Sequence, residues 1–160
     1  MPYPALYPPV DPNYRPKAVV RNMFLDHVDR KVAVTILDTL AASDAQMRVA
    51  QLRVLGGAMA RVPADATAFA HRDAKIMANL AVFFEGADDQ ALRTAWVTDF
   101  AAALEQGEAG AYVNFLGDEG AERVRAAYPA PTWDRLVAVK TKYDPQNLFR
   151  LNQNVPPAQP

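Results

Sequence analysis

Few residues of this 160-residue chain have the types and spacing of a catalytic centre. The sequence has no cysteine, which excludes disulfides, thiolate metal sites and thiol nucleophiles. Its two histidines, His27 and His71, stand alone, without the partner four residues away that a helical metal site requires. We therefore expect no metal site, and we expect any redox chemistry to come from a bound cofactor.

The acidic pair Asp88-Asp89 directly precedes a stretch of helical periodicity. Capping of that helix explains the pair better than a carboxylate dyad does, because acids stabilise helix N-termini. The sequence also lacks a glycine-rich phosphate loop and a Gly-x-Ser-x-Gly nucleophile elbow. The common hydrolase and nucleotide-binding centres are therefore excluded.

A polar cluster near the C-terminus is more unusual, since Asn147, Asn152, Gln153 and Asn154 lie in chain without any period. Amide side chains both donate and accept hydrogen bonds, which suits recognition of a heterocycle or of another domain's backbone. A solvated tail is the alternative explanation for such a segment.

Periodic segments predict the elements that must position these residues. The predicted strands are residues 17–25, 47–55, 58–62, 75–84 and 111–115. The predicted helices are residues 28–40, 89–107, 117–128 and 132–143. Gly56-Gly57 should form the hairpin between the second and third strands. Leu92, Trp96, Phe100, Ala103 and Leu104 should form the buried stripe of the second helix.

The order of these elements lacks the βαβ alternation of a parallel sheet. We therefore predict an α+β fold, an antiparallel sheet covered by helices on one face. The strand at 75–84 has one wholly apolar face and a mixed face that contains Asn79. The mixed face predicts contact with solvent or a cavity.

The overall charge argues against two kinds of partner. Seventeen basic and eighteen acidic residues give a net charge of −1 with no basic run, so nucleic acid is not expected to bind. No window approaches the ~20 apolar residues of a membrane span, and no membrane partner is expected. The first residues also lack the pattern of an export signal, which predicts a cytoplasmic protein.

Several runs resemble those of a known family. Tyr112-Val-Asn-Phe-Leu-Gly-Asp and the long run from Trp133 to Pro157 resemble the C-terminal signature of berberine-bridge-enzyme-like FAD-linked oxidases. Gly56-Gly-Ala and the run from Ala66 to Arg72 resemble the strand region that precedes this signature. The resemblance covers the chain from about residue 15 onward.

In that family one domain binds FAD, and an antiparallel second domain roofs the isoalloxazine ring and forms the substrate pocket. The resemblance implies three segments, namely a proline-rich lead (1–16), a substrate-domain sheet with helices (17–110) and a berberine-like C-terminal segment (111–160). It implies FAD as the cofactor, bound mainly by a domain absent from this chain. The implied partners are a FAD-binding domain or chain and a small-molecule substrate, and homo-oligomerisation stays open.

The resemblance also assigns site residues. Those at positions near the flavin are Tyr112, Asn114, Asn152 and Gln153, and those at positions facing the substrate are Asn79 and Phe115. Alcohol-oxidising members place a basic tyrosine where this chain has Phe115, and a phenyl ring cannot take a proton. Asn79, on the strand where some members place a carboxylate, cannot take a proton either, so the resemblance leaves the base unidentified. Tyr112 is the candidate catalytic residue, provided that a neighbouring cation stabilises its phenolate.

The implied function is oxidation of a small organic substrate by hydride transfer to flavin, with this chain inactive when alone. A stand-alone ligand-binding or dimerisation module without catalysis remains an alternative, with its ligand on the face around Asn79 and Tyr112. A degenerate oxidase that keeps the fold but lacks a base is a third. The substrate itself cannot be read from the sequence.

Overall fold

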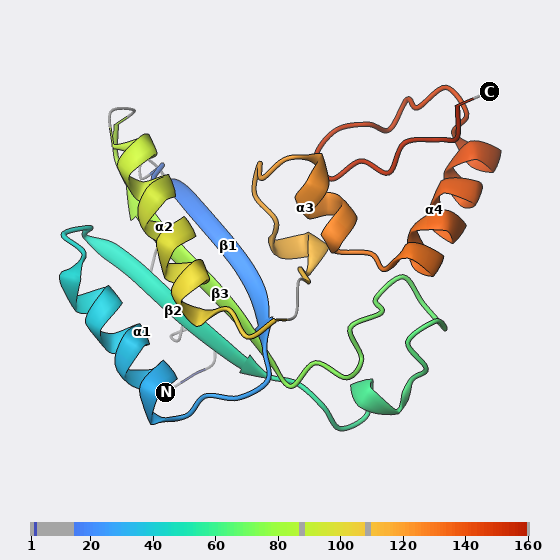
Figure 1. The fold of residues 1–160 in the computed structure, drawn as a ribbon. Coiled ribbons are helices and arrows are strands. Elements are labelled where there is room, and N and C mark those ends of the chain that lie inside the picture. Colours follow the sequence, from blue (N-terminus) through green and yellow to red (C-terminus); the bar gives the residue numbers. More distant parts are fainter. Residues whose placement is uncertain (1, 3–14, 87–88, 108–109, 160) are drawn as a thin grey trace.

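A three-stranded antiparallel sheet with two helices on one face dominates the computed structural model, which describes residues 2, 15–86, 89–107 and 110–159 (Figure 1). The predicted α+β class is confirmed. The helices and strands in chain order are β1 (Lys17–Leu25), α1 (Arg30–Ala42), β2 (Met47–Val54), the 3-10 turn η2 (Met59–Arg61), β3 (Ile76–Phe84), α2 (Gln90–Leu104), the 3-10 turn η3 (Val113–Phe115), α3 (Ala121–Ala126) and α4 (Ala130–Tyr143). Most of the predicted lead and Asp88 lie outside the described residues.

The sheet has the order β1-β3-β2, with both neighbours antiparallel to β3. The predicted hairpin between β2 and residues 58–62 is therefore wrong. Residues 58–62 are rich in helix-forming side chains and are followed by Pro63, and they contain η2. β2 instead pairs with β3, from Met47↔Phe83 to Val54↔Ile76, because the apolar β3 strand can be buried on its whole length.

One face of the sheet forms the core with α1 and α2. Met23, Ala78 and Leu80 of the sheet pack against a cluster that includes Ile36 of α1 and Phe100 of α2. These residues alternate along their strands, as expected when one face is buried. The core is thus built from residues 17–104, on the side of the sheet away from the mixed face.

The predicted buried stripe of α2 is partly wrong. Phe100 and Leu104 are buried, but Leu92 is 57% exposed and Arg93 is buried in its place. The guanidinium of Arg93 lies 2.5 Å from a carboxylate oxygen of Asp44, which turns this side of the helix toward the end of α1. The same contact holds the pKa of the Asp44 carboxyl below its ordinary value. Asp89 is the N-cap residue of α2, but its side chain makes no capping hydrogen bond.

The predicted strand at 111–115 is also wrong. Its backbone forms the turn η3, closed by Phe115 N donating to Tyr112 O at 2.9 Å. Tyr112 N donates to the side chain of Asn22 rather than to a neighbouring strand. The segment therefore crosses the sheet without joining it.

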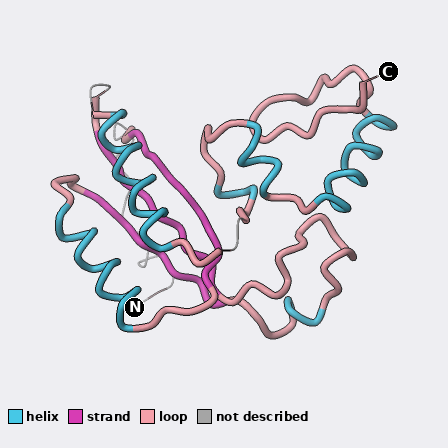
Figure 2. The backbone as a smooth tube through the Cα atoms, viewed as in Figure 1, coloured by secondary structure: helices cyan, strands magenta, loops and turns pink. Residues whose placement is uncertain are grey.

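Long loops and two further helices form a second region beside the sheet (Figure 2). α4 begins at Ala130 after Pro129, so Thr132 lies within it and is not its predicted cap, while Asp144 ends it as predicted. The loop between β2 and β3 joins this region through Arg135, which donates to Asp65 O, and through His71, 3.1 Å from Ala127 O. Among the described helices, none combines the length and apolar character needed to cross a membrane.

Candidate functional site

The sheet face that α1 and α2 leave uncovered carries a row of amide side chains. Asn22 of β1, Asn79 of β3 and Gln51 of β2 lie directly opposite one another, so they share this face. Asn79 is thus on the mixed face, as the alternation of β3 predicts. Sequence analysis missed Asn22, although an asparagine inside the run Val19-Val-Arg-Asn-Met-Phe-Leu was a usable signal.

Asn22 joins the sheet to the C-terminal region. It is fully buried, and its Oδ1 accepts a hydrogen bond from Tyr112 N at 2.5 Å. Its backbone oxygen accepts another from Nη2 of Arg123 at 2.8 Å. Asn22 Nδ2 and Asn79 Oδ1 are buried without a hydrogen-bond partner among the described residues. This face thus carries one donor and one acceptor that no described protein group satisfies.

Tyr112 lies in an aromatic cluster at the end of this face. Its ring meets Phe69 and Phe115 edge to face, with centroids 5.6 and 5.5 Å away. Its hydroxyl oxygen accepts a hydrogen bond from Asn114 Nδ2 at 2.7 Å, which leaves the phenol hydrogen available to another group. Two of the predicted site residues, Tyr112 and Phe115, are therefore in direct contact.

A cavity of about 340 Å³ opens beside Tyr112. The residues that line this cavity, here called the sheet pocket, are Arg53, Leu55, Met59, Phe69, Arg72, Met77 and Tyr112. Its walls are mainly apolar, and two arginines supply its charge. Neither Asn79 nor Phe115 lines it, so the sheet pocket contains neither of the two predicted substrate-facing residues.

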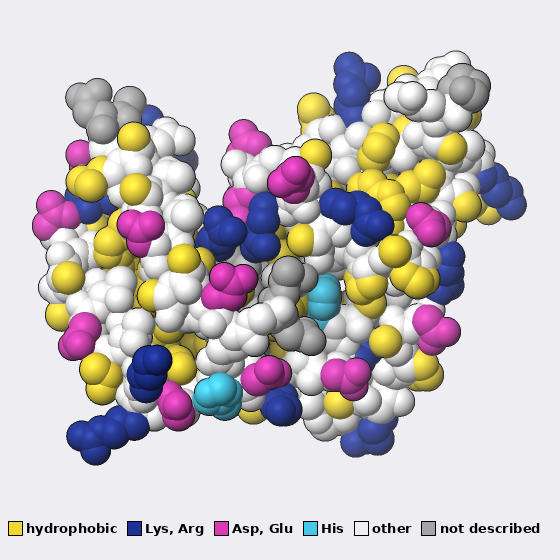
Figure 3. All heavy atoms as spheres, in the orientation of Figure 1, with side chains coloured by type: hydrophobic (Ala, Val, Ile, Leu, Met, Phe, Trp, Pro, Cys, Tyr) yellow, Lys and Arg dark blue, Asp and Glu magenta, His cyan; other side chains and the backbone are white. Residues whose placement is uncertain are grey.

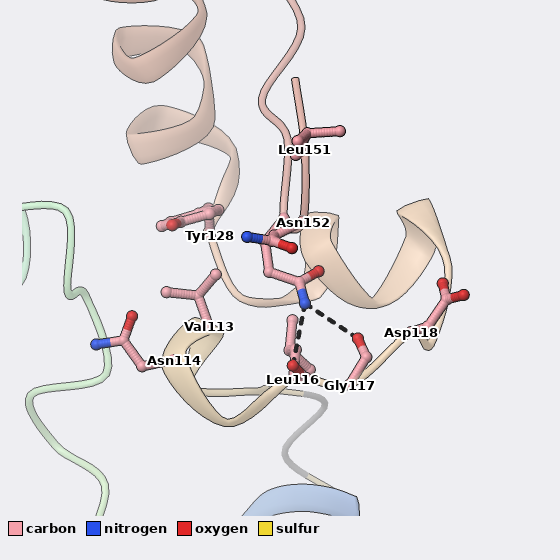
Figure 4. A pocket seen from close by; sticks show the side chains of 9 residues that line it. Val113, Asn114, Leu116, Gly117, Asp118, Tyr128, Leu151 and Asn152 are labelled. Carbon is pink, nitrogen blue, oxygen red and sulfur yellow. Dashed lines mark hydrogen bonds between the residues drawn. The ribbon is translucent and has the colours of Figure 1, made fainter. Parts of the chain in front are cut away.

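A larger groove of about 940 Å³ lies between η3 and the last residues of the chain (Figure 4). The residues that line it, here called the terminal groove, are Val113, Asn114, Leu116, Gly117, Asp118, Tyr128, Leu151, Asn152 and Gln153. Three of the four residues predicted to contact the flavin, Asn114, Asn152 and Gln153, thus meet in one groove. Tyr112 is not among the lining residues and reaches the groove only through its hydrogen bond to Asn114.

Gln153 fixes one wall of the terminal groove to the other. Its Nε2 donates to Leu116 O and Gly117 O, at 3.0 Å each, and Figure 4 draws both bonds. Asn152 beside it has a φ of +59°, a left-handed conformation that asparagine tolerates better than most residues. Burial raises the pKa of the Tyr128 phenol, so this group stays neutral and can donate a hydrogen bond within the groove.

A carboxylate cap sets the direction of the last segment. Asp144 accepts hydrogen bonds from the backbone N–H groups of Leu148 and Phe149, at 2.8 and 3.0 Å. Lys140 Nζ lies 2.6 Å from the same carboxylate and also donates to Phe149 O. The hydrogen bond from Lys140 is the main reason why the pKa of Asp144 lies below its ordinary value. This cap turns the chain back from α4, so that residues 151–153 reach the groove.

These side chains can bind and orient a polar molecule, and their chemistry offers little else. Amides and a neutral phenol donate and accept hydrogen bonds, but they do not transfer electrons. No group of three or more His, Asp or Glu side chains is arranged to hold a metal ion within the described ranges.

Comparison with known proteins agrees with the resemblance seen in the sequence. Residues 111–156 match the family described as "Berberine and berberine like". The chain is 35% identical over 105 residues to the uncharacterized FAD-linked oxidoreductase YgaK of Bacillus subtilis, covering 66% of this chain and 23% of the relative. It is 31% identical over 115 residues to monolignol oxidoreductase AtBBE-like 13 of Arabidopsis thaliana, covering 63% and 22%. The chain therefore spans less than a quarter of the length of these relatives.

Solved structures show the same fold. The structure of BBE-like 1 from Physcomitrella patens superimposes with a TM-score of 0.76 at 19% identity, over 94% of this chain and 32% of that protein. The aclacinomycin oxidoreductase structure does so with a TM-score of 0.72 at 21% identity, over 89% and 33%. The architecture seen here is thus that of one part of larger oxidoreductases.

Proposed function

From its relationship to the berberine-bridge-enzyme-like FAD-linked oxidoreductases, we propose that this chain is the substrate-domain part of a flavin-dependent oxidase. The whole enzyme oxidises a small organic substrate by hydride transfer to FAD, and its FAD-binding domain is supplied outside this chain. Residues 17–110 form the substrate domain and residues 111–160 the berberine-like segment. The observation that carries the proposal is the convergence of Asn114, Asn152 and Gln153 on the terminal groove.

The terminal groove has the chemistry to meet one edge of a flavin. The isoalloxazine ring presents alternating carbonyl oxygens and ring nitrogens, and amide side chains can match both kinds of group. Asn154 Oδ1 is buried without a partner in the described part of the chain, which leaves a further acceptor near this segment. FAD, when bound, supplies the hydride acceptor. The role of Asn152 and Gln153 is to bind and orient it.

Tyr112 is the proposed proton-accepting residue. Its oxygen accepts a hydrogen bond from Asn114, and, once its own proton has left to solvent, this oxygen takes the proton of a substrate hydroxyl in the sheet pocket. Phe115 and Asn79 remain proposed substrate-facing residues without a part in proton transfer, although neither lines the sheet pocket.

The test is to produce the chain together with the FAD-binding domain of its own enzyme and to titrate FAD. We expect Asn152→Ala to weaken FAD binding by roughly tenfold, since one polar contact is lost. Gln146→Ala, an exposed amide outside the groove, is the matched control and should bind FAD normally. Equal FAD affinity for wild type and Asn152→Ala would argue against this assignment of the groove.

The exposed apolar residues Leu148, Phe149 and Leu151 favour a second candidate function. They suit a stand-alone dimerisation or ligand-binding module, because such surfaces mark protein contacts. Size-exclusion chromatography separates the two functions. A dimer that persists when the FAD-binding domain is added supports the module, whereas a dimer that dissociates into a one-to-one complex supports the oxidase.

A further inference from the structure

The sheet pocket is unusual in its charge. Arg53 and Arg72 line it together with apolar and aromatic side chains, and none of its lining residues is acidic. Its volume of about 340 Å³ is near the lower end of the range of small-molecule sites. The pocket thus joins apolar walls with two positively charged side chains.

The Arg72 guanidinium is used entirely in contacts with residues of the loop that forms one wall of the sheet pocket. Its Nε donates to Phe69 O at 2.9 Å, its Nη2 to Thr67 Oγ1 at 2.6 Å and its Nη1 to Met59 O at 3.5 Å. Its guanidinium also lies over the Phe69 ring, 5.0 Å from the centroid. All three nitrogens of this guanidinium are engaged, so Arg72 braces the loop between β2 and β3.

The Arg53 guanidinium makes a hydrogen bond at only one of its edges. Its Nε donates to Gln51 Oε1 at 3.1 Å, and its guanidinium carbon lies 4.6 Å from the centroid of the Phe115 ring. Neither Nη atom has a hydrogen-bond or ion-pair partner within the described residues. The ring and Gln51 restrict the orientation of the side chain, while its outer edge remains available. A guanidinium fixed in this way matches the planar geometry of a carboxylate.

We propose that Arg53 binds a carboxylate of the substrate, and that the substrate is an aromatic acid of small size. This inference rests on the proposed function and deepens it. Arg53 and Met77 are cross-strand partners on the uncovered face, so the carboxylate lies at the β2 end of the pocket. The hydrocarbon part of the substrate packs on Met77 and Phe69, and its oxidised carbon lies beside Tyr112.

The experiment titrates the isotope-labelled 160-residue chain with naphthoate and with naphthamide, its uncharged counterpart, and follows the backbone amide signals by NMR. We expect naphthoate to bind roughly fivefold to tenfold more tightly, with the largest shifts at Arg53, Met77 and Tyr112. Arg53→Gln should abolish the difference between the two probes, and Arg53→Lys should retain part of it. Arg30→Gln, an exposed arginine at the start of α1, is the matched control.

Three results would overturn the inference. They are equal binding of the two probes, no binding of either, and a preference for naphthoate that survives Arg53→Gln. An unchanged amide spectrum outside the pocket shows that the variant is folded. Because this titration uses no flavin, failure of the proposed function is separate: a chain that prefers naphthoate but never supports flavin reduction keeps its anion site and is not an oxidase part.

Discussion

The two regions of this molecule are held together in different ways. The sheet with α1 and α2 packs on an apolar core in which Leu80, Val82 and Phe100 are almost completely buried. The C-terminal region depends on polar contacts to backbone atoms, chiefly those of Asp144 and Gln153. It leaves Leu148, Phe149 and Leu151 66%, 83% and 84% exposed, and apolar side chains gather over α3 and α4 in Figure 3.

This difference indicates that the first region is a scaffold and that the second is an interaction surface. A core of this kind folds through burial of its own apolar area. The C-terminal segment exposes large apolar side chains, and its polar side chains form hydrogen bonds within the segment itself. Such a surface is better suited to contact another domain. The two proposed sites lie in the second region and where it crosses the sheet.

The largest loss of stability should come from a substitution in the apolar core. Phe100→Ala removes a side chain that is 1% exposed and should lower the free energy of unfolding by about 3–5 kcal/mol. Leu92→Ala on the same helix is the control, and its effect should stay within about 0.5 kcal/mol because Leu92 is largely exposed. Urea denaturation measures both, and similar losses for the two variants would refute the scaffold assignment.

The second largest loss of stability should come from a substitution at the junction between the two regions. Asn22→Ala leaves the partly buried N–H of Tyr112 without its acceptor and should lower the free energy of unfolding by about 1–3 kcal/mol. Gln51→Ala lies in the same row of amides but is exposed, so it should change the free energy of unfolding little. If Asn22→Ala were as mild as Gln51→Ala, the two regions would not be coupled through this residue.

Within the C-terminal region, Gln153→Ala removes the two hydrogen bonds that close the terminal groove. We expect a loss of about 1 kcal/mol in the free energy of unfolding, because the bonds are partly exposed. Amide hydrogen exchange should increase at residues 151–155 and stay unchanged in β3. Faster exchange throughout the sheet would show that the regions are not separate.

The smallest effect is a local dependence on pH. Since Lys140 and two backbone N–H groups lower the pKa of Asp144, its stabilising contribution is complete above the ordinary value of 3.8 and is lost as the pH falls through the lowered value. The protection of the Leu148 and Phe149 amides, measured as their exchange rate relative to that of an unstructured chain at the same pH, should therefore fall in acid. In Asp144→Asn these two amides should be poorly protected at all pH values, whereas Asp134→Asn, a change of an exposed acid of α4, should behave as wild type. Identical acid profiles for wild type and Asp144→Asn would exclude this cap.

Sequence reasoning succeeded where the structure is determined by local periodicity. The strands at 17–25 and 75–84 and the helix predicted at 28–40, which is α1, follow from patterns of two and of 3.6 residues. It failed where the local structure depends on a contact with a residue far away in the sequence. The turn at 113–115 depends on Asn22, which lies 90 residues from Tyr112, and the rotation of α2 depends on the pair Arg93–Asp44.

The same distinction applies to the site. The family resemblance assigned Asn114, Asn152 and Gln153, and the terminal groove brings them together. Neither periodicity nor the resemblance indicated the buried Asn22 or the arginine over Phe115, because both depend on cross-strand register. The roles of all six predicted site residues stay predictions.

The most direct test of this account is the visible absorbance spectrum of the chain, purified alone and together with the FAD-binding domain of its own enzyme. The chain alone should be colourless and without oxidase turnover, and the complex should bind flavin and bleach when substrate is added without oxygen. A chain that carries stoichiometric flavin when alone, or turns over substrate without a partner, would contradict the account.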